Sequence, residues 1–123
     1  MKLHAHSPLG HTVTSHGPGF IAVDGHRHEH SLLLLPEGID PAWGPQRFED
    51  LAAHHLSPLA DLGDAIVLLG TGSRQRFPAP ALLRPLIEAG IGLEVMDTAA
   101  ACRTYNLLVS EGRKVAAALI IER

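Results

Sequence analysis

The sequence has one cysteine, few charged residues and no long apolar run. The single cysteine, Cys102, excludes an intrachain disulfide and a zinc site built from several cysteines. Residues 65–69 and 115–121 are the longest apolar runs, and both are much shorter than the roughly 20 residues of a membrane-spanning helix. Residues 1–10 lack both the apolar stretch of a secretory signal and the arginine-rich pattern of a mitochondrial presequence. We therefore expect no transmembrane segment and a bacterial, cytoplasmic location.

The composition predicts a single domain over residues 1–123, and the segment patterns described below predict that it is an α/β domain. Hydrophobic residues make up 46% of the chain, enough for one continuous core. The 12 glycines and 9 prolines indicate short elements joined by many turns. The net charge of -3 predicts no broad nucleic-acid surface. Seven of the ten lysines and arginines follow residue 70, so an anion-binding surface is expected in the C-terminal half.

The N-terminal half predicts an antiparallel hairpin. Asp24 and Gly25 form a two-residue turn signal, because both turn positions require positive φ. We expect one strand over residues 17–23 and a second over residues 26–35. Pro36 ends the second strand, since proline cannot donate a hydrogen bond to a neighbouring strand.

The next segment predicts a loop and a short helix. Residues 36–47 contain three prolines and two glycines around Trp43, which indicates an ordered loop held in place by the indole ring. Residues 48–55 carry apolar side chains at helical spacing and predict a short helix. Residues 56–63 are expected to form a turn.

The C-terminal half predicts a strand-helix-strand unit. Residues 65–69 fit a strand that is buried on both faces. Residues 80–90 fit a helix with a kink at Pro85. Residues 91–96 are expected at a sheet edge, because Glu94 in mid-strand discourages pairing with another chain.

A longer helix and a last strand complete the predicted fold. Asp97 or Thr98 is expected to cap a helix that ends near residue 110. Residues 115–121 form an apolar strand whose alanines leave room for closely packed helices. We place this strand at the centre of the sheet.

Two long motifs indicate a family. They are LLGTGSRQRFP at residues 68–78 and GIGLEVMDTAAACRTYNLLVSEGRKVAAALI at residues 90–120. Together with a glycine-rich first strand and Trp43, they resemble the NADH dehydrogenase (complex I) assembly factor 3 family over about residues 15–121. The resemblance implies an α/β fold with a mixed five-stranded central sheet and helices on its faces. In mitochondria such a protein helps to assemble the membrane-bound NADH dehydrogenase, whereas bacterial relatives have no established activity, and no catalytic residues come with the family.

Two loops after parallel strands predict a ligand crevice. Loops at the carboxyl ends of such strands line the usual ligand site, and a glycine-rich turn can bind an anion through its N–H groups. The loops span residues 70–76 and 97–106, and a right-handed crossover would place them on the same side of the sheet. Gln75 replaces the third glycine of the dinucleotide motif, so tight structural turns are the alternative. The expected ligand-binding residues are Gly70, Thr71, Gly72, Ser73, Arg74, Arg76, Thr98, Arg103 and Asn106.

Other chemically active residues give weaker patterns. His26, His28 and His30 would share one face of a strand, but no further ligand is visible, so we favour a solvated polar face over a metal site. Cys102 lies on the apolar stripe of its predicted helix, which favours a core residue over a nucleophile. Ser73 lacks the surroundings of a hydrolase serine. The sequence predicts no catalytic residue, no metal and no cofactor.

We therefore expect a non-enzymatic binding or assembly-factor-like protein that assists assembly of a respiratory membrane complex through a protein partner. The alternative is an enzyme that binds a small anion or nucleotide between residues 70–76 and 97–106. A metal-binding module on residues 26–30 ranks third. The sequence identifies neither partner nor ligand, and it leaves a homo-oligomer open.

Overall fold

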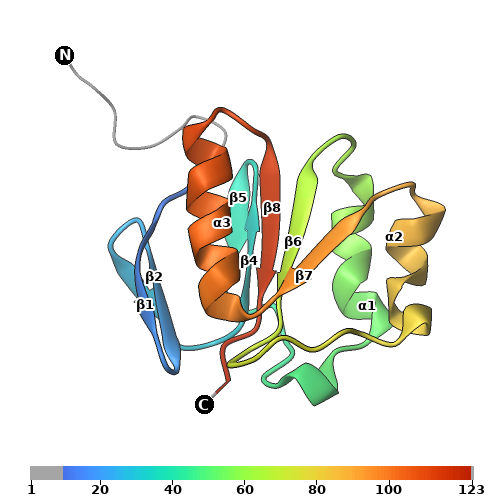
Figure 1. Cartoon of the computed structure of the whole chain (residues 1–123), viewed down its shortest axis with the longest axis horizontal. Coiled ribbons are helices and arrows are strands. Elements are labelled where there is room, and N and C mark those ends of the chain that lie inside the picture. Colours follow the sequence, from blue (N-terminus) through green and yellow to red (C-terminus); the bar gives the residue numbers. More distant parts are fainter. Residues whose placement is uncertain (1–9, 123) are drawn as a thin grey trace.

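The computed structural model describes residues 10–122, which form an α/β fold with two sheets (Figure 1). The first sheet contains β1 (Val13–Gly17), β2 (Phe20–Val23) and β3 (His26–His28). The second contains β4 (Leu32–Leu35), β5 (Gly38–Asp40), β6 (Ile66–Gly70), β7 (Leu93–Met96) and β8 (Val115–Leu119). The strand order is β1-β2-β3 in the antiparallel sheet and β5-β4-β8-β6-β7 in the mixed sheet. The α/β class and the mixed five-stranded sheet are confirmed.

The predicted hairpin is present, with a strand before it that the sequence did not reveal. Val23 pairs with His26 across the turn, where Asp24 and Gly25 have φ values of 51° and 85°. β1 occupies the polar segment that precedes the predicted first strand and pairs antiparallel with β2. Residues 17–19, predicted as strand, end β1 and turn the chain instead.

The single strand predicted over residues 26–35 is wrong, because the chain changes sheets within it. β3 ends at His28, and β4 pairs with β8 through Leu32 and Leu119. Between them, the Ser31 hydroxyl accepts a hydrogen bond from the Ile121 N–H at 2.9 Å. β3 is polar and largely exposed, whereas Leu32 to Leu34 are buried on both faces, so only the latter stretch fits the middle of a sheet.

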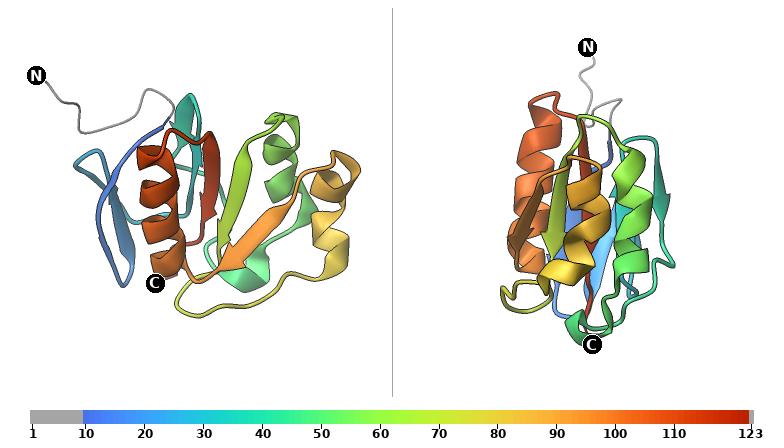
Figure 2. Two further views of the ribbon diagram at one scale, coloured as in Figure 1. Left: turned by 45° about the horizontal axis from the view of Figure 1, so that its top comes forward. Right: turned by 90° about the vertical axis from the view of Figure 1, so that its right-hand side faces the viewer.

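Two layers of side chains cover the larger sheet. The helix α3 (Thr98–Ser110) and the small sheet cover one face, and α1 (Ala53–Leu56) and α2 (Arg84–Glu88) cover the other (Figure 2). β8 serves both cores because successive side chains point to opposite faces. Val115, Ala117 and Leu119 pack on the α3 side, and Ala116 and Ala118 pack on the α1 and α2 side. β8 is central, as predicted.

The short helices are more broken than predicted. The helix expected over residues 48–55 is a 3-10 turn at Phe48–Asp50 followed by α1, and the expected turn after it contains a 3-10 helix, Ser57–Asp61. The helix expected over residues 80–90 is a 3-10 turn, Pro80–Leu83, followed by α2. Pro85 lies in the first turn of α2, where a missing N–H has no cost, so it starts a helix instead of kinking one.

The loop around Trp43 is held as predicted, although part of it is strand. Trp43 is 7% exposed, and its indole N–H donates to the His55 carbonyl at 2.8 Å. β5 lies within this segment and pairs with β4, so the prediction of loop throughout residues 36–47 is wrong.

The strand-helix-strand unit places the candidate site. β7 is parallel to β6 and forms one edge of the sheet, with Glu94 exposed as expected. Asp97 caps α3, accepting a hydrogen bond from the Ala100 N–H at 2.8 Å. No helix within residues 10–122 is long and apolar enough to cross a membrane.

Candidate functional site

The two loops predicted to meet do meet, at the carboxyl ends of β6 and β7. The Thr98 N–H donates to the Gly72 carbonyl at 2.9 Å, and the Gly72 N–H donates to the Thr98 hydroxyl oxygen at 2.8 Å. The Thr98 hydroxyl in turn donates to the Ile120 carbonyl at 2.7 Å. The start of α3 is therefore bonded to both the loop after β6 and the residue after β8.

The loop of residues 70–76 is organised around a buried hydroxyl. Thr71 has no exposed surface, and its hydroxyl donates to the Arg74 carbonyl at 2.7 Å and accepts from the Arg76 N–H at 3.2 Å. The Gln75 side-chain amide donates to the Val95 carbonyl at 2.9 Å. Gln75 occupies the position where a dinucleotide-binding loop needs glycine. Its side chain instead hydrogen-bonds to a backbone carbonyl of the edge strand β7.

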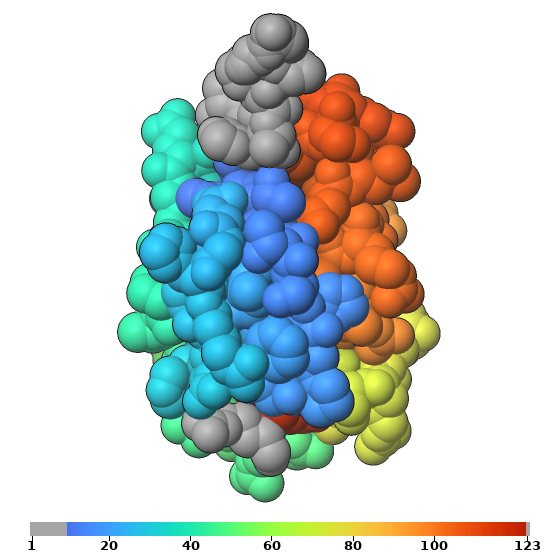
Figure 3. Space-filling model, turned by 90° about the vertical axis from the view of Figure 1, so that its left-hand side faces the viewer, coloured from blue at the N-terminus to red at the C-terminus, as the bar shows by residue number. Residues whose placement is uncertain are grey.

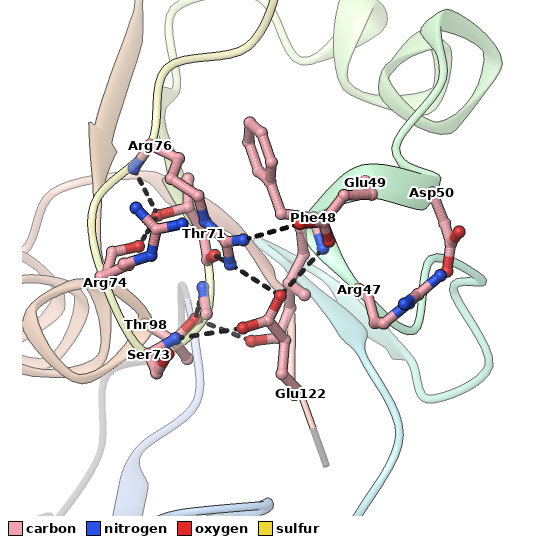
Figure 4. A network of polar contacts seen from close by, with 12 residues as sticks. Arg47, Phe48, Glu49, Asp50, Thr71, Ser73, Arg74, Arg76, Thr98 and Glu122 are labelled. Carbon is pink, nitrogen blue, oxygen red and sulfur yellow. Dashed lines mark hydrogen bonds and ion pairs between the residues drawn. The ribbon is translucent and has the colours of Figure 1, made fainter.

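Arg76 is the centre of a polar network that joins three segments (Figure 4). Its Nη2 lies 2.7 Å from Glu122 Oε2 and donates to the Thr71 carbonyl at 2.8 Å. Its Nη1 lies 3.2 Å from Glu49 Oε2, and the guanidinium carbon lies 4.8 Å from the centre of the Phe48 ring. The Arg76 side chain is only 15% exposed, and its Nε has no hydrogen-bond partner within the described part of the chain. Arg76 therefore connects the loop, the 3-10 turn at Phe48–Asp50 and the residues after β8.

Glu122 completes this network as its main acceptor. Its carboxylate accepts hydrogen bonds from the Phe48 N–H at 3.1 Å and from the Ser73 N–H at 3.4 Å, besides the bond from Arg76. Burial raises the pKa of Glu122, but the bonds from Phe48, Arg76 and Ser73 together outweigh burial and lower the pKa below its usual value. Neither Glu122 nor Glu49 belongs to a local motif, so sequence patterns gave no signal for either.

Gly72 is required by this packing. Its φ is +101°, a backbone conformation that residues other than glycine rarely adopt. A Cβ at this position would collide with the Glu122 carboxylate and lie 2.9 Å from Arg76 Nη2. The glycine predicted as part of an anion cradle thus makes room for an internal ion pair.

A cavity of about 310 Å³ lies beside these loops, between the β1–β2 turn and the start of α3. Its apolar walls come from β2, from α3 and from the residues that follow β8, and they include Phe20, Ile21, Ala99 and Ile121. Figure 3 shows this side of the molecule, where the blue strands β1 and β2 lie against the orange α3 and the yellow loop. The polar residues on its lining are His16, Ser73, Asp97, Thr98 and Glu122.

The predicted ligand-binding residues divide into those that line the cavity and those that do not. Gly72, Ser73 and Thr98 line it. The lining does not include Gly70, Thr71, Arg74, Arg76, Arg103 or Asn106. That any of these residues binds a ligand stays a prediction.

Asn106 lies along α3 from the cavity and holds β1. Its side-chain oxygen accepts from the Val13 N–H at 2.9 Å, and its side-chain amide donates to the Val13 carbonyl at 2.8 Å. The Asn106 side chain thus pairs with both backbone groups of Val13, as the backbone of a neighbouring strand would. Arg103, on the same helix, is exposed.

The cysteine and the histidines of residues 26–30 lie outside the cavity. Cys102 is fully buried, as predicted from the helix stripe, and burial raises the pKa of its thiol to about 12. His26 and His28 lie in β3, whereas His30 lies beyond the end of that strand. Within residues 10–122, no group of three or more His, Cys, Asp or Glu residues is arranged to hold a metal ion.

The fold and the site define a small two-sheet α/β domain with a cavity at the carboxyl edge of its parallel strands. Residues 13–120 match the family described as "Protein of unknown function (DUF498/DUF598)", and the chain belongs to this family.

The chain is similar to NADH dehydrogenase assembly factors. It is 35% identical over 120 residues to NADH dehydrogenase [ubiquinone] 1 alpha subcomplex assembly factor 3 from Bos taurus, covering 96% of this chain and 65% of that protein. The chain thus spans slightly less than two thirds of the bovine protein. An uncharacterized protein from Rhodobacter capsulatus is 40% identical over 108 residues, covering 88% of this chain and 82% of that protein.

Solved structures share the fold. A crystal structure of a Bordetella parapertussis protein has a TM-score of 0.83 and 43% identity, covering 97% of this chain and all (100%) of that one. The solution NMR structure of a Bordetella pertussis protein, a Mth938-like domain, has a TM-score of 0.78 and 36% identity, covering 99% of this chain and 93% of that one.

Proposed function

We propose that this protein is an assembly-factor-like binding protein that assists assembly of an NADH dehydrogenase in the respiratory membrane. The observation that carries the proposal is the 35% identity to the bovine assembly factor 3 across 96% of the chain. Because the match extends through both sheets and all three helices, it concerns the complete fold and not one isolated motif.

The geometry of the site supports a binding role. The polar groups of Thr71, Arg76, Thr98 and Glu122 are bonded to one another or to backbone groups, so they stiffen the loops around the cavity. A rigid surface lowers the entropy that is lost when a partner binds. The partner we infer is a protein subunit of the complex. We propose that the chain binds this subunit in the cytoplasm, before or during the subunit's insertion into the membrane.

Affinity capture from the bacterial host tests this function. The tagged chain, expressed at its native level, should enrich subunits of NADH dehydrogenase from membranes solubilised in a mild detergent. Deletion of the gene should lower the amount of assembled enzyme on native gels, and the wild-type gene should restore it. A deletion strain with the normal amount of assembled enzyme, together with no enrichment of its subunits, would refute the proposal.

A further inference from the structure

The cavity at the start of α3 combines apolar walls with an acidic rim. Phe20 and Ile21 of β2 form one wall, and Ala99 of α3 and Ile121 form others. Ile21 and Ile121 also pack in the core, so these walls are backed by the fold. At about 310 Å³, the cavity is at the lower limit of small-molecule sites, which suits one large side chain better than a dinucleotide.

The groups on the rim favour a cation over an anion. Asp97 uses one carboxylate oxygen, Oδ1, to cap α3, and no hydrogen bond within residues 10–122 uses its Oδ2. The carboxylate thus already occupies the helix N-terminus, where an anion would otherwise bind. Glu122, also on the rim, is paired with Arg76.

Arg27, which lies against the Phe20 ring, does not reverse that charge. The guanidinium carbon of Arg27 lies 4.1 Å from the centre of the Phe20 ring, but its Nε is 2.9 Å from Glu29 Oε2. Arg27 is therefore paired with a carboxylate. Asp97 remains the charge on the rim without a basic partner within the described part of the chain.

We propose that this cavity is the docking site for a partner segment in which a large apolar side chain stands next to a lysine or arginine. The apolar side chain enters between Phe20 and Ala99. The neighbouring cation pairs with Asp97, and the exposed Ser73 hydroxyl can bond to the backbone of the segment. The proposal rests on the proposed function in taking the segment to belong to an NADH dehydrogenase subunit.

Two matched small probes test the chemistry of the cavity. 2-Phenylethylammonium and 3-phenylpropionate share an apolar body and carry opposite charges. Each is titrated at pH 8 into ¹⁵N-labelled protein, and amide shifts are followed by NMR. The ammonium probe should shift Ile21, Ala99 and Ile121 in a saturable manner and bind at least about fivefold more tightly than the carboxylate, the scale of one exposed charge pair. Equal affinities, or shifts confined to other residues, would overturn the proposal.

Two variants separate charge from shape. Asp97→Asn keeps a good helix cap but removes the charge, so the affinities of the two probes should come within about twofold of each other. Ala99→Leu fills the cavity and should abolish the shifts caused by both probes. Ser110→Leu adds the same side chain at an exposed position of α3 and should leave probe binding unchanged. Undisturbed amide spectra before titration would show that each variant is folded, and unchanged probe binding in Ala99→Leu would contradict the proposal.

The same variants distinguish this site from the proposed function. In affinity capture, Ala99→Leu should lose the NADH dehydrogenase subunits, whereas Ser110→Leu should retain them. Capture of these subunits by both variants would disprove the docking site and leave the function standing. The wild-type chain could also fail to capture the subunits while showing the expected preference between the probes. That result would refute the function and the identity of the partner, but the cavity's preference for an apolar cation would stand.

Discussion

The guanidinium of Arg76 lies 2.7 Å from the carboxylate of Glu122, in a site where the two side chains are only 15% and 20% exposed. The pair joins the loop after β6 to the residues after β8, and Glu49 and Phe48 extend it to a third segment. Arg76 thus links three segments of the chain, and its expected role in ligand binding stays a prediction.

Arg76→Ala should destabilise the protein. The substitution removes the ion pair and the bond to the Thr71 carbonyl, and it leaves a half-buried carboxylate without its cation. Because the pair is neither fully buried nor exposed, we expect a loss of about 1 to 3 kcal/mol in the free energy of unfolding. Urea denaturation followed by Trp43 fluorescence measures it. The matched control is Arg74→Ala, an exposed arginine of the same loop, which should change stability by less than about 0.5 kcal/mol.

The contribution of Glu122 should depend on pH. Its pKa is lowered in the folded state, so its stabilising contribution is complete above the usual glutamate pKa of about 4.3 and is lost as the pH falls through the folded value. Wild type should therefore exceed Glu122→Gln in stability at pH 7, and the difference should shrink below about pH 4. Urea titrations between pH 3 and pH 7 test this. A difference that stays constant over this range would contradict the predicted linkage.

Gly72→Ala should be costly even though the added group is one methyl. The positive φ and the contact with the Glu122 carboxylate both oppose a Cβ at this position. We expect a loss of about 1 to 3 kcal/mol. Gly92→Ala is the control, since no atom lies within 4 Å of its added Cβ, and it should change stability by less than about 0.5 kcal/mol. Equal effects at the two glycines would mean that the space around Gly72 is not limiting.

Asn106→Ala should loosen β1. Both backbone groups of Val13 lose their partner on α3, and Val13 is 5% exposed, so water replaces that partner poorly. The expected loss is about 1 to 3 kcal/mol. Hydrogen exchange should accelerate at the Val13 amide before it accelerates in β8. Arg103→Ala, an exposed change on the same helix, should leave this exchange rate unaltered.

Much of the architecture could be predicted because it depends on local patterns. The Asp24–Gly25 turn, the cap at Asp97 and the apolar strand β8 each follow from a few adjacent residues. The meeting of the two loops followed from one general rule on the handedness of crossovers. The error at β3 and β4 occurred because only three residues, 29–31, separate these strands, so they read as one strand although they belong to different sheets.

The sequence by itself determined the α/β class, the central position of β8, the edge position of β7 and the burial of Cys102, because spacing and residue type dictate these features. The tertiary structure alone decided the partners of the polar side chains. Arg76 and Glu122 are 46 residues apart, and Val13 and Asn106 are 93 apart. Local periodicity carries no information about such pairs, because they form only when folding brings distant segments together and a buried charge or backbone group must be satisfied.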